Sequence, residues 1–284
     1  MTRILGLGDN TIDTYVDVGV QYPGGNALNV AAMTARLGAS TAYLGCVGND
    51  DGGELVRRAL VAEGVDISRV RTRVGANARA YIGHVDGDRH FIRSDPGVRA
   101  DYRWDDDDFT YIASFDHVHT SIYGDLGDAL PRIAASAGSL SLDASDQWTT
   151  DYLGQVLPYV RYIFLSAPEL SEPDAIAVAK ECLALGAKAV VLTRGSEGAL
   201  GVSTEGPVFQ PALPTSVVDT LGAGDGFISG FLTELLTGKS LKDAMTRGAE
   251  FAALVCSWQG GFGHGAPWAG DPYVARTAPA TPSK

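Results

Sequence analysis

Continuous apolar runs alternate with segments in which apolar residues recur at helical spacing, from Arg3 to about Cys256. The continuous runs are typical of buried strands. They predict strands at Ile4 to Leu7, Thr41 to Val47, His117 to Ser121, Leu140 to Asp143, Tyr162 to Leu165 and Ala189 to Thr193. The other segments predict helices at Ala27 to Leu37, Glu54 to Glu63, Asp174 to Leu185, Gly226 to Leu236 and Leu241 to Trp258. This alternation predicts an α/β fold in which a mostly parallel sheet lies between layers of crossover helices.

Two segments depart from this alternation. Ile12 to Val18 and Ala78 to Ile92 show polar and apolar residues in turn, and the second surrounds the turn Val85-Asp86-Gly87-Asp88. They predict a small β-sheet inserted at about 12–20 and 76–98. A sheet of this size cannot hold its own core, so it must pack on something else. We expect a lid over a site, and a surface through which a homodimer could form.

Length and composition favour one large core, because 45% of the 284 residues are hydrophobic. We expect a single domain over 1–271 and a flexible tail, rich in Ala, Pro and Thr, over 272–284. A formal net charge of −12 disfavours a nucleic-acid partner. No apolar run approaches the ~20 residues that span a bilayer, and the chain start lacks a signal-peptide core. We therefore expect a cytoplasmic protein that has no membrane partner and acts on a small molecule.

Cysteine and histidine offer little reactive chemistry in this pattern. Cys46, Cys182 and Cys256 are widely separated, lie in apolar contexts and form no C-x-x-C pair, which is typical of reduced core residues. His117 and His119 would share one face of a strand and could bind zinc. Two ligands without a third are more often packing residues, so we do not expect a metal there.

A glycine-rich segment near the C-terminus has the pattern of an anion site. Gly222, Ala223, Gly224 and Asp225 stand where an extended segment turns into an apolar helix. Glycine allows close approach of the backbone to a ligand, and the free amides at a helix start favour negative charge. Asp225 could accept the proton of a hydroxyl held beside those amides. Helix capping alone would also explain this short motif.

A second glycine motif, near the N-terminus, predicts sugar binding. Gly24 and Gly25 would let backbone amides approach a sugar, and Asn26 and Asn29 can both donate to hydroxyls and accept from them. A turn before a helix explains the glycines but not the paired asparagines.

Three polar residues follow the first predicted strand. Asp9, Asn10 and Asp13 would lie at the carboxyl end of the sheet, where ligands of open α/β folds usually bind. They are candidate substrate-binding residues.

Together the two motifs resemble the signatures of the PfkB, or ribokinase-type, carbohydrate kinases. The pattern D-T-x-G-A-G-D-x-F-x-x-G-F begins at Asp219, and the N-terminal pattern continues with Gly38 and Gly48 at the family spacing. The resemblance implies a ribokinase-like three-layer sandwich with a small β-sheet lid. It also implies ATP-dependent phosphorylation of a primary hydroxyl of a sugar. Asp225 would be the general base, Gly222 to Gly224 the anion hole, and Asp13 the carboxylate that holds sugar hydroxyls.

The same resemblance predicts a nucleotide site. The run Thr193-Arg194-Gly195-Ser196-Glu197-Gly198 resembles the family's turn that contacts ATP phosphates, through Thr193, Gly195 and Gly198. The stretch 249–257 would supply part of the adenine wall. The family's N-x-x-E motif organises Mg2+, and here Glu169 is retained while Ser166 replaces the asparagine. Glu169 would therefore act on the metal through water. A monovalent cation such as K+ could be a further cofactor, and the sequence does not show whether one is required.

Finer details resemble the fructoselysine 6-kinase subfamily. They include the segment from Gly8 to Asp13, the run Asp143-x-Ser145-Asp146-x-Trp148, and Ser166-Ala167-Pro168. The resemblance implies that a fructosamine is phosphorylated at O6, with Asp9 or Arg93 meeting its charged groups. A fructokinase or another keto-sugar kinase is the alternative. A sugar-binding regulator without activity on the same fold is the alternative from a different class.

Overall fold

The computed structural model describes residues 2–85 and 88–270. The strands within these residues are β1 (Arg3–Gly8), β2 (Thr11–Tyr15), β3 (Val20–Gly24), β4 (Ser40–Gly48), β5 (Arg71–Arg73), β6 (Arg79–Val85), β7 (Asp88–Asp95), β8 (His117–Ser121), β9 (Leu140–Asp143), β10 (Tyr162–Ser166), β11 (Ala189–Thr193), β12 (Ala199–Ser203), β13 (Gly206–Gln210) and β14 (Ala266–Pro267). The α-helices are α1 (Asn26–Arg36), α2 (Asp51–Ala62), α3 (Asp106–Ile112), α4 (Leu130–Ser136), α5 (Thr150–Val156), α6 (Glu172–Ala184), α7 (Ala223–Leu235) and α8 (Leu241–Val255). The predicted tail at 272–284 lies outside the described residues.

The larger sheet has the strand order β13-β12-β11-β10-β9-β8-β1-β4-β5 in the described part of the chain. Its strands from β11 to β5 pair in parallel, whereas β12 pairs antiparallel with both β11 and β13. All six predicted strands are present, because their apolar residues are buried between two helical layers. The predicted α/β fold is confirmed.

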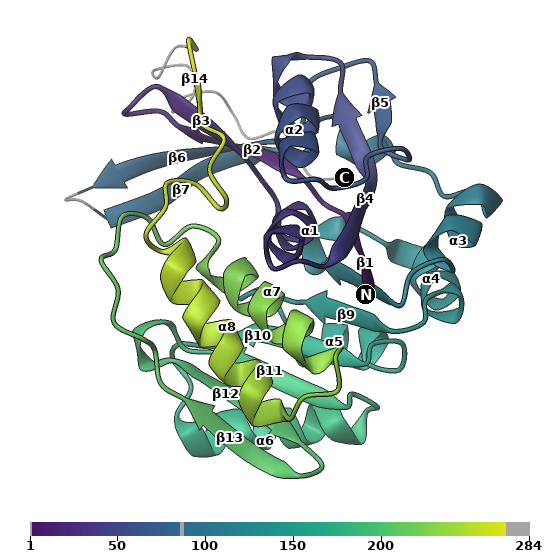
Figure 1. The fold of residues 1–284 in the computed structure, drawn as a ribbon, viewed down its shortest axis with the longest axis vertical. Coiled ribbons are helices and arrows are strands. Elements are labelled where there is room, and N and C mark those ends of the chain that lie inside the picture. The colour runs from purple at the N-terminus through teal and green to yellow at the C-terminus, as the bar shows by residue number, and fades with distance from the viewer. Residues whose placement is uncertain (1, 86–87, 271–284) are drawn as a thin grey trace.

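Helices cover both faces of this sheet (Figure 1). One core cluster joins α3, α4, α5 and α6 to one face, and includes Ile112, Ile133 and Leu153. The other face packs against α1, α2, α7 and α8 through two further clusters. The five predicted helices all form, but α7 begins at Ala223, three residues before its predicted start.

Within the described residues, a smaller sheet of five strands, in the order β14-β3-β2-β6-β7, stands beside the sandwich. Its Tyr15, Tyr22 and Ile82 form a small apolar cluster, against which Leu221, just before α7, also packs. The predicted segment Ile12 to Val18 contributes only β2 and the turn after it. Sequence periodicity missed β3, because this strand ends in the glycine motif at Gly24 and contains a proline.

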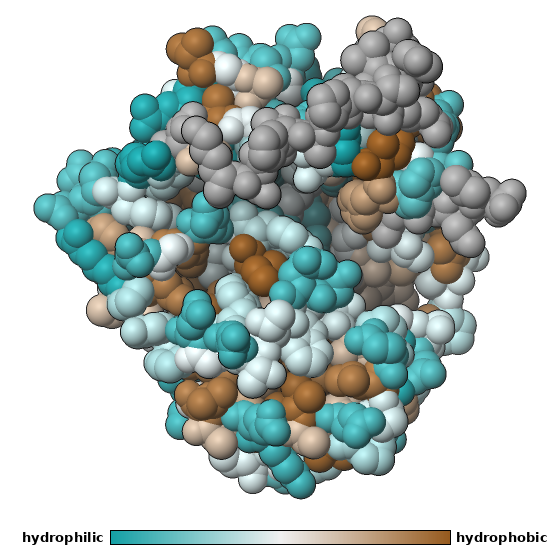
Figure 2. All heavy atoms as spheres, turned by 180° about the vertical axis from the view of Figure 1, so that it is seen from behind, coloured by the Kyte–Doolittle hydropathy of each residue, from teal (hydrophilic) through white to brown (hydrophobic). Residues whose placement is uncertain are grey.

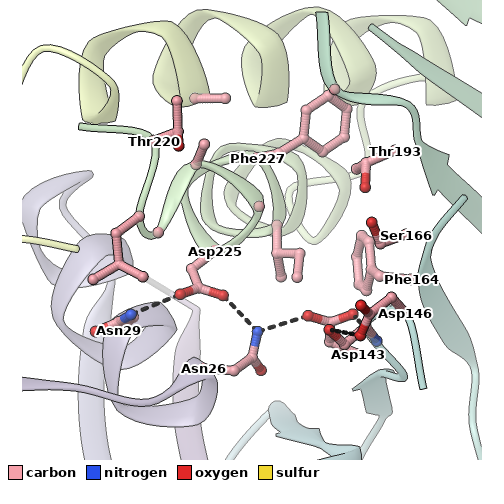
Figure 3. A pocket seen from close by; sticks show the side chains of 18 of the residues that line it. Asn26, Asn29, Asp143, Asp146, Phe164, Ser166, Thr193, Thr220, Asp225 and Phe227 are labelled. Carbon is pink, nitrogen blue, oxygen red and sulfur yellow. Dashed lines mark hydrogen bonds between the residues drawn. The ribbon is translucent and has the colours of Figure 1, made fainter. Parts of the chain in front are cut away.

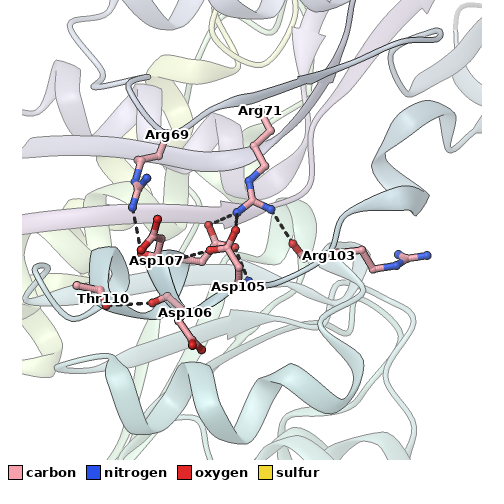
Figure 4. A network of polar contacts seen from close by, with 8 residues as sticks. Arg69, Arg71, Arg103, Asp105, Asp106, Asp107 and Thr110 are labelled. Atoms are coloured by element: carbon pink, nitrogen blue, oxygen red, sulfur yellow. Dashed lines mark hydrogen bonds and ion pairs between the residues drawn. The ribbon is translucent and has the colours of Figure 1, made fainter.

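The acidic run at Asp105 to Asp108 begins α3, with reciprocal capping bonds between these two residues. Asp108 is buried, and its Oδ1 forms an ion pair with Arg71 at 2.7 Å. Figure 4 shows Arg71 of β5 reaching Asp105 as well. This network fastens the edge strand of the large sheet to the helix that follows the lid.

The surface carries its exposed apolar residues in small groups. Figure 2 shows, on the rear face, brown residues separated by teal ones over the part that is not grey. No helix of the described residues is long and apolar enough to cross a membrane.

Candidate active site

A cavity of about 1310 Å3 lies where the carboxyl ends of the parallel strands meet the start of α7 and the small sheet. Its walls come from the ends of β1, β9, β10 and β11, from α1, α7 and α8, and from β6 and β7. This is the position at which open α/β sheets bind ligands. The small sheet therefore borders a site, as a lid would, and most of the predicted site residues line one cavity.

The start of α7, where the sequence predicts an anion site, borders the cavity. Gly222 caps the helix with a left-handed φ of 79°, and a Cβ there would lie 2.7 Å from the Cα of Gly261. The Ala223 amide already donates to the carbonyl of Thr220, at 3.2 Å. A Cβ on Gly224 would meet nothing within 4 Å, so the backbone there faces open space in the cavity. A negatively charged ligand can approach this end of the helix.

Asp225 lies in the first turn of α7 and is held by two asparagines of α1 (Figure 3). Asn26 Nδ2 donates to its Oδ1 at 2.6 Å, and Asn29 Nδ2 donates to its Oδ2 at 2.6 Å. Burial raises the pKa of Asp225 to about 6, while the two amide hydrogen bonds act in the opposite direction. The carboxylate is thus fixed in place and able to take up a proton near neutral pH.

Asp143, at the end of β9, is a site residue that the sequence analysis did not select. The same Asn26 nitrogen that binds Asp225 donates to Asp143 Oδ2 at 2.9 Å, so one amide bridges two carboxylates. Burial, and then the nearby negative charges, raise the pKa of Asp143 to about 7. Its position at the carboxyl end of a predicted strand was the available signal, as for Asp9. Asp146 lines the cavity beside it.

The three polar residues after β1 have different surroundings. Asp9 and Asp13 line the cavity, and Asp9 Oδ1 accepts from Ser121 Oγ at 2.7 Å. Asn10 does not line it. Its side chain is fully buried and donates to Tyr43 and to the Cys46 carbonyl, so it ties this loop to β4. The Asn10 side chain is therefore not accessible to a ligand in the cavity, in contrast to its predicted role in binding substrate.

The N-terminal glycines make room for these polar groups. A Cβ on Gly24 would lie 1.9 Å from Asp13 Oδ2, and one on Gly25 would lie 2.5 Å from the Cα of Asn10. Gly25 also has a left-handed φ of 105°. Gly24 does not itself line the cavity, whereas Gly25 does. The glycine pair thus seats the carboxylate of Asp13 and starts α1 in the position that brings both asparagines to Asp225.

The predicted nucleotide residues line the other end of the same cavity. Thr193, Gly195 and Gly198 belong to its lining, as does Ser166. An apolar wall comes from α8 and the residues after it, and from the loop after β13; it includes Ala249, Ala252, Ala253, Cys256, Leu213 and Val217. Cys46 and Cys182 are buried as predicted, but Cys256 is only partly buried and faces the cavity, because the helix ends at Val255.

The predicted metal residue lies elsewhere. Glu169 is exposed, on the turn after β10, and is not part of the cavity lining. The described residues contain no group of three or more His, Cys, Asp and Glu side chains that could hold a metal ion. A Mg2+ ion in this cavity would therefore have to take most of its ligands from a nucleotide and from water.

Arginines line the part of the cavity that borders the small sheet. Arg93 of β7 donates to Asp95 Oδ1 at 3.0 Å and lies over the ring of Tyr81, 4.2 Å from its centroid. Arg79 and Arg99 line the cavity with it. Because Arg93 is held from two sides, its guanidinium has a fixed place in the lid.

Comparisons with known proteins agree with this architecture. The model of the pfkB family carbohydrate kinases matches residues 8–266. The chain is 38% identical over 270 residues to the fructosamine kinase FrlD of Bacillus subtilis, covering 94% of this chain and 95% of that protein. It is 34% identical over 262 residues to the fructoselysine 6-kinase of Escherichia coli, covering 92% and 99%.

A solved structure shares the fold. The Arabidopsis thaliana ribokinase complexed with ribose and ATP superposes with a TM-score of 0.78 at 22% identity, covering 92% of this chain and 94% of that one. The predicted ribokinase-like sandwich is therefore confirmed. The chain belongs to the pfkB family of carbohydrate kinases, and the predicted enzyme class, an ATP-dependent carbohydrate kinase, is confirmed with it.

Proposed function

We propose that this enzyme transfers the γ-phosphoryl group of ATP to O6 of a fructosamine, with fructoselysine as the preferred substrate. The observation that carries the proposal is the placement of Asp225, held by two amides at the start of α7 in a cavity with carboxylates at one end and an apolar wall at the other. The similarity to a fructosamine kinase and to fructoselysine 6-kinases supports the choice of substrate.

The catalytic step requires a base and a place for negative charge. Asp225 accepts the proton of the sugar hydroxyl as its oxygen attacks the γ-phosphorus, and the bond from that phosphorus to the β-phosphate oxygen breaks to release ADP. The backbone from Gly222 to Gly224 and the positive end of the α7 dipole stabilise the charge on the transferred group. Because the Ala223 amide already donates to the Thr220 carbonyl, the amides of Gly222 and Gly224 are better placed to donate to the phosphoryl group.

ATP fits the remaining half of the cavity. Thr193, Gly195 and Gly198 lie where they can bind phosphates, and the wall from α8 can cover adenine. When bound, Mg2+ neutralises phosphate charge during transfer. Since Glu169 lies outside the lining, we propose that it meets the metal shell only through water. A requirement for K+ stays a prediction, and comparing rates in K+ and Na+ buffers tests it.

Fructoselysine differs from fructose in carrying a cationic secondary amine and an amino-acid carboxylate. Asp9, Asp13 and Asp143 give the sugar end an excess of negative charge suited to the amine. We propose that the guanidinium of Arg93 binds the amino-acid carboxylate. A neutral keto-sugar such as fructose has no charged group that could bind these carboxylates or Arg93.

A substrate screen tests the proposal. Purified enzyme, ATP and Mg2+ are combined with fructoselysine, fructose, ribose or adenosine, and ADP release is measured. We expect the highest kcat/KM with fructoselysine. A higher value with fructose would favour the keto-sugar alternative. Asp225→Asn should lower kcat by about 10²- to 10⁴-fold while fructoselysine binding persists in calorimetry. Wild-type protein that binds sugar without turnover would instead support a regulator.

Assembly remains a prediction as well. The strand β7 forms one edge of the small sheet in the described residues, and its Phe91 is 62% exposed. An open edge can pair with a second copy, so we propose a homodimer through the lid sheet. Light scattering of the purified protein gives its mass directly, and a monomer at all concentrations would contradict the proposal.

A further inference from the structure

A row of buried polar side chains connects the middle of the large sheet to Asn26. His117 Nε2 lies 2.8 Å from Ser141 Oγ, and Ser141 Oγ lies 2.7 Å from His119 Nδ1. His119 Nε2 lies 2.9 Å from Asn26 Oδ1. These four residues come from β8, β9 and α1, and all are buried. Polar groups are costly to bury unless each is bonded, so a row of this kind needs a reason.

The two carboxylates determine the direction of every bond in the row. Asn26 uses both hydrogens of Nδ2 on Asp143 and Asp225, so its Oδ1 must face His119 and accept. His119 must then carry its proton on Nε2. Burial lowers the pKa of His119 well below its usual value, so the ring is neutral and its Nδ1 can only accept.

The remaining bonds follow from the same reasoning. Ser141 donates its hydroxyl hydrogen to Nδ1 of His119, and its oxygen accepts from Nε2 of His117. Burial lowers the pKa of His117 to about 3, so that ring is neutral too. Its Nδ1 is then left as a buried acceptor without a partner among the described residues. The row has one consistent set of proton positions, and it ends on the carboxylate proposed as the base.

We infer that His119 is a positioning residue for the phosphoryl transfer, whose Nε2–H holds the Asn26 amide with both hydrogens directed at Asp143 and Asp225. This inference rests on the proposed function, since it concerns the ionisation of the base. A locked amide stabilises the ionised form of Asp225, whereas a freely rotating one can also present its oxygen to a protonated carboxyl. The carboxylate is therefore kept deprotonated at lower pH than its burial alone would allow.

The groups that could confuse a pH measurement are few. Asp143 and Asp9 face Asp225 from the ends of β9 and β1, and both act to raise its pKa or share its titration. After burial, the neighbouring His117 also lowers the pKa of His119, and Arg161 lowers that of His117. Both histidines stay neutral over the pH range in which ionisation of Asp143 and Asp225 affects activity. The acidic limb of the pH profile therefore reports the carboxylates.

The test compares kcat against pH for His119→Phe, His119→Gln and His117→Phe. His119→Phe removes the donor to Asn26 and should raise the apparent pKa of the acidic limb by about one unit. At pH values well below that pKa, kcat should be about tenfold lower than in the wild type, and KM for ATP should change little. His119→Gln retains an N–H near the position of Nε2, so the apparent pKa of its acidic limb should lie close to that of the wild type. His117→Phe is the matched control, equally buried on the same strand, and should leave the limb in place, because Ser141 can still donate to His119.

Two measurements keep the inference falsifiable if His119→Phe does not fold. Ser141→Ala removes the hydroxyl that donates to His119 Nδ1 and thereby supports the Nε2–H tautomer, so it should raise the apparent pKa of the acidic limb by a smaller amount. Nitrogen NMR of the wild-type ring should show a neutral His119 protonated on Nε2. A proton on Nδ1, or variants at 117 and 119 that lose activity equally at every pH, would overturn the inference. Full activity of Asp225→Asn would instead overturn the proposed function.

Discussion

Asn26 Nδ2 lies 2.6 Å from Asp225 Oδ1 and 2.9 Å from Asp143 Oδ2, so a single amide joins the carboxylate at the start of α7 to the carboxylate at the end of β9. In sequence, Asn26 is 117 positions from Asp143 and 199 positions from Asp225. Because both carboxylates accept from the same amide nitrogen, the ionisation of one affects that of the other.

The first prediction concerns activity and pH. A base must be ionised to accept a proton, and the pKa of Asp225 is raised to about 6. We expect kcat/KM to be level near neutral pH and to fall by about tenfold per pH unit below about 6. A profile measured with saturating ATP and Mg2+ checks this. A rate that stays constant down to about pH 5 would contradict the role of Asp225.

The second concerns stability and pH. Folding raises the pKa of Asp143 to about 7 and of Asp225 to about 6, so the folded state favours their protonated forms. Their contribution to stability is fully present below the unfolded pKa near 4 and is lost as pH rises through about 6 to 7. Asp225→Asn removes one titrating group. Its Tm should therefore decline less between about pH 5 and pH 8 than that of the wild type, measured by calorimetry. Parallel Tm curves would argue against the shared site.

The third separates two glycines of one motif. Gly222→Ala forces a Cβ to within 2.7 Å of Gly261 in a left-handed conformation, and it should cost about 1–3 kcal/mol of unfolding free energy. Gly224→Ala has open space around its Cβ, so its Tm should change little, while the added methyl group obstructs the phosphoryl site and lowers kcat. Denaturation and rate measurements on both variants test this. Equal effects of the two on Tm would be inconsistent with the geometry.

The fourth concerns the amino-acid end of the substrate. Arg93 is held by Asp95 and Tyr81 at the border of the cavity. Arg93→Ala should raise KM for fructoselysine by about tenfold, because a charge-assisted bond to the carboxylate is lost. Any KM for fructose should stay the same, since fructose lacks the carboxylate. An equal rise for both sugars would show that Arg93 supports the lid rather than the substrate.

The fifth locates the nucleotide. Cys256 faces the cavity, whereas Cys46 and Cys182 are buried. Burial also raises the pKa of the Cys256 thiol, so alkylation by iodoacetamide should be slow. ATP should slow the modification of Cys256 further, as followed by mass spectrometry, and fructoselysine should not. Cys256→Ala provides the matched control for the remaining thiols. Protection by sugar alone would place the nucleotide elsewhere.

The sequence by itself determined the architecture and the family to which the glycine motifs belong. Continuous apolar runs such as Ala189 to Thr193 have few ways to be buried other than as inner strands, and glycines such as Gly222 mark conformations that other residues avoid. Local rules of this kind act over a few residues, so they can be seen without a structure. The start of α7 was misplaced by three residues because glycines disfavour a helix interior but are tolerated in its first turn.

Only the tertiary structure decided which polar residues meet. Asp143 looked like the end of a strand, and His119 like a packing residue, until the parallel register of β8 and β9 put Ser141 beside both histidines. Asn10 was selected for its place after β1, yet burial against β4 directs its amide away from the cavity. Side-chain contacts between segments that are far apart in sequence depend on how strands and helices pack in three dimensions. The pattern of residues along the chain does not show how far apart two such side chains lie in space.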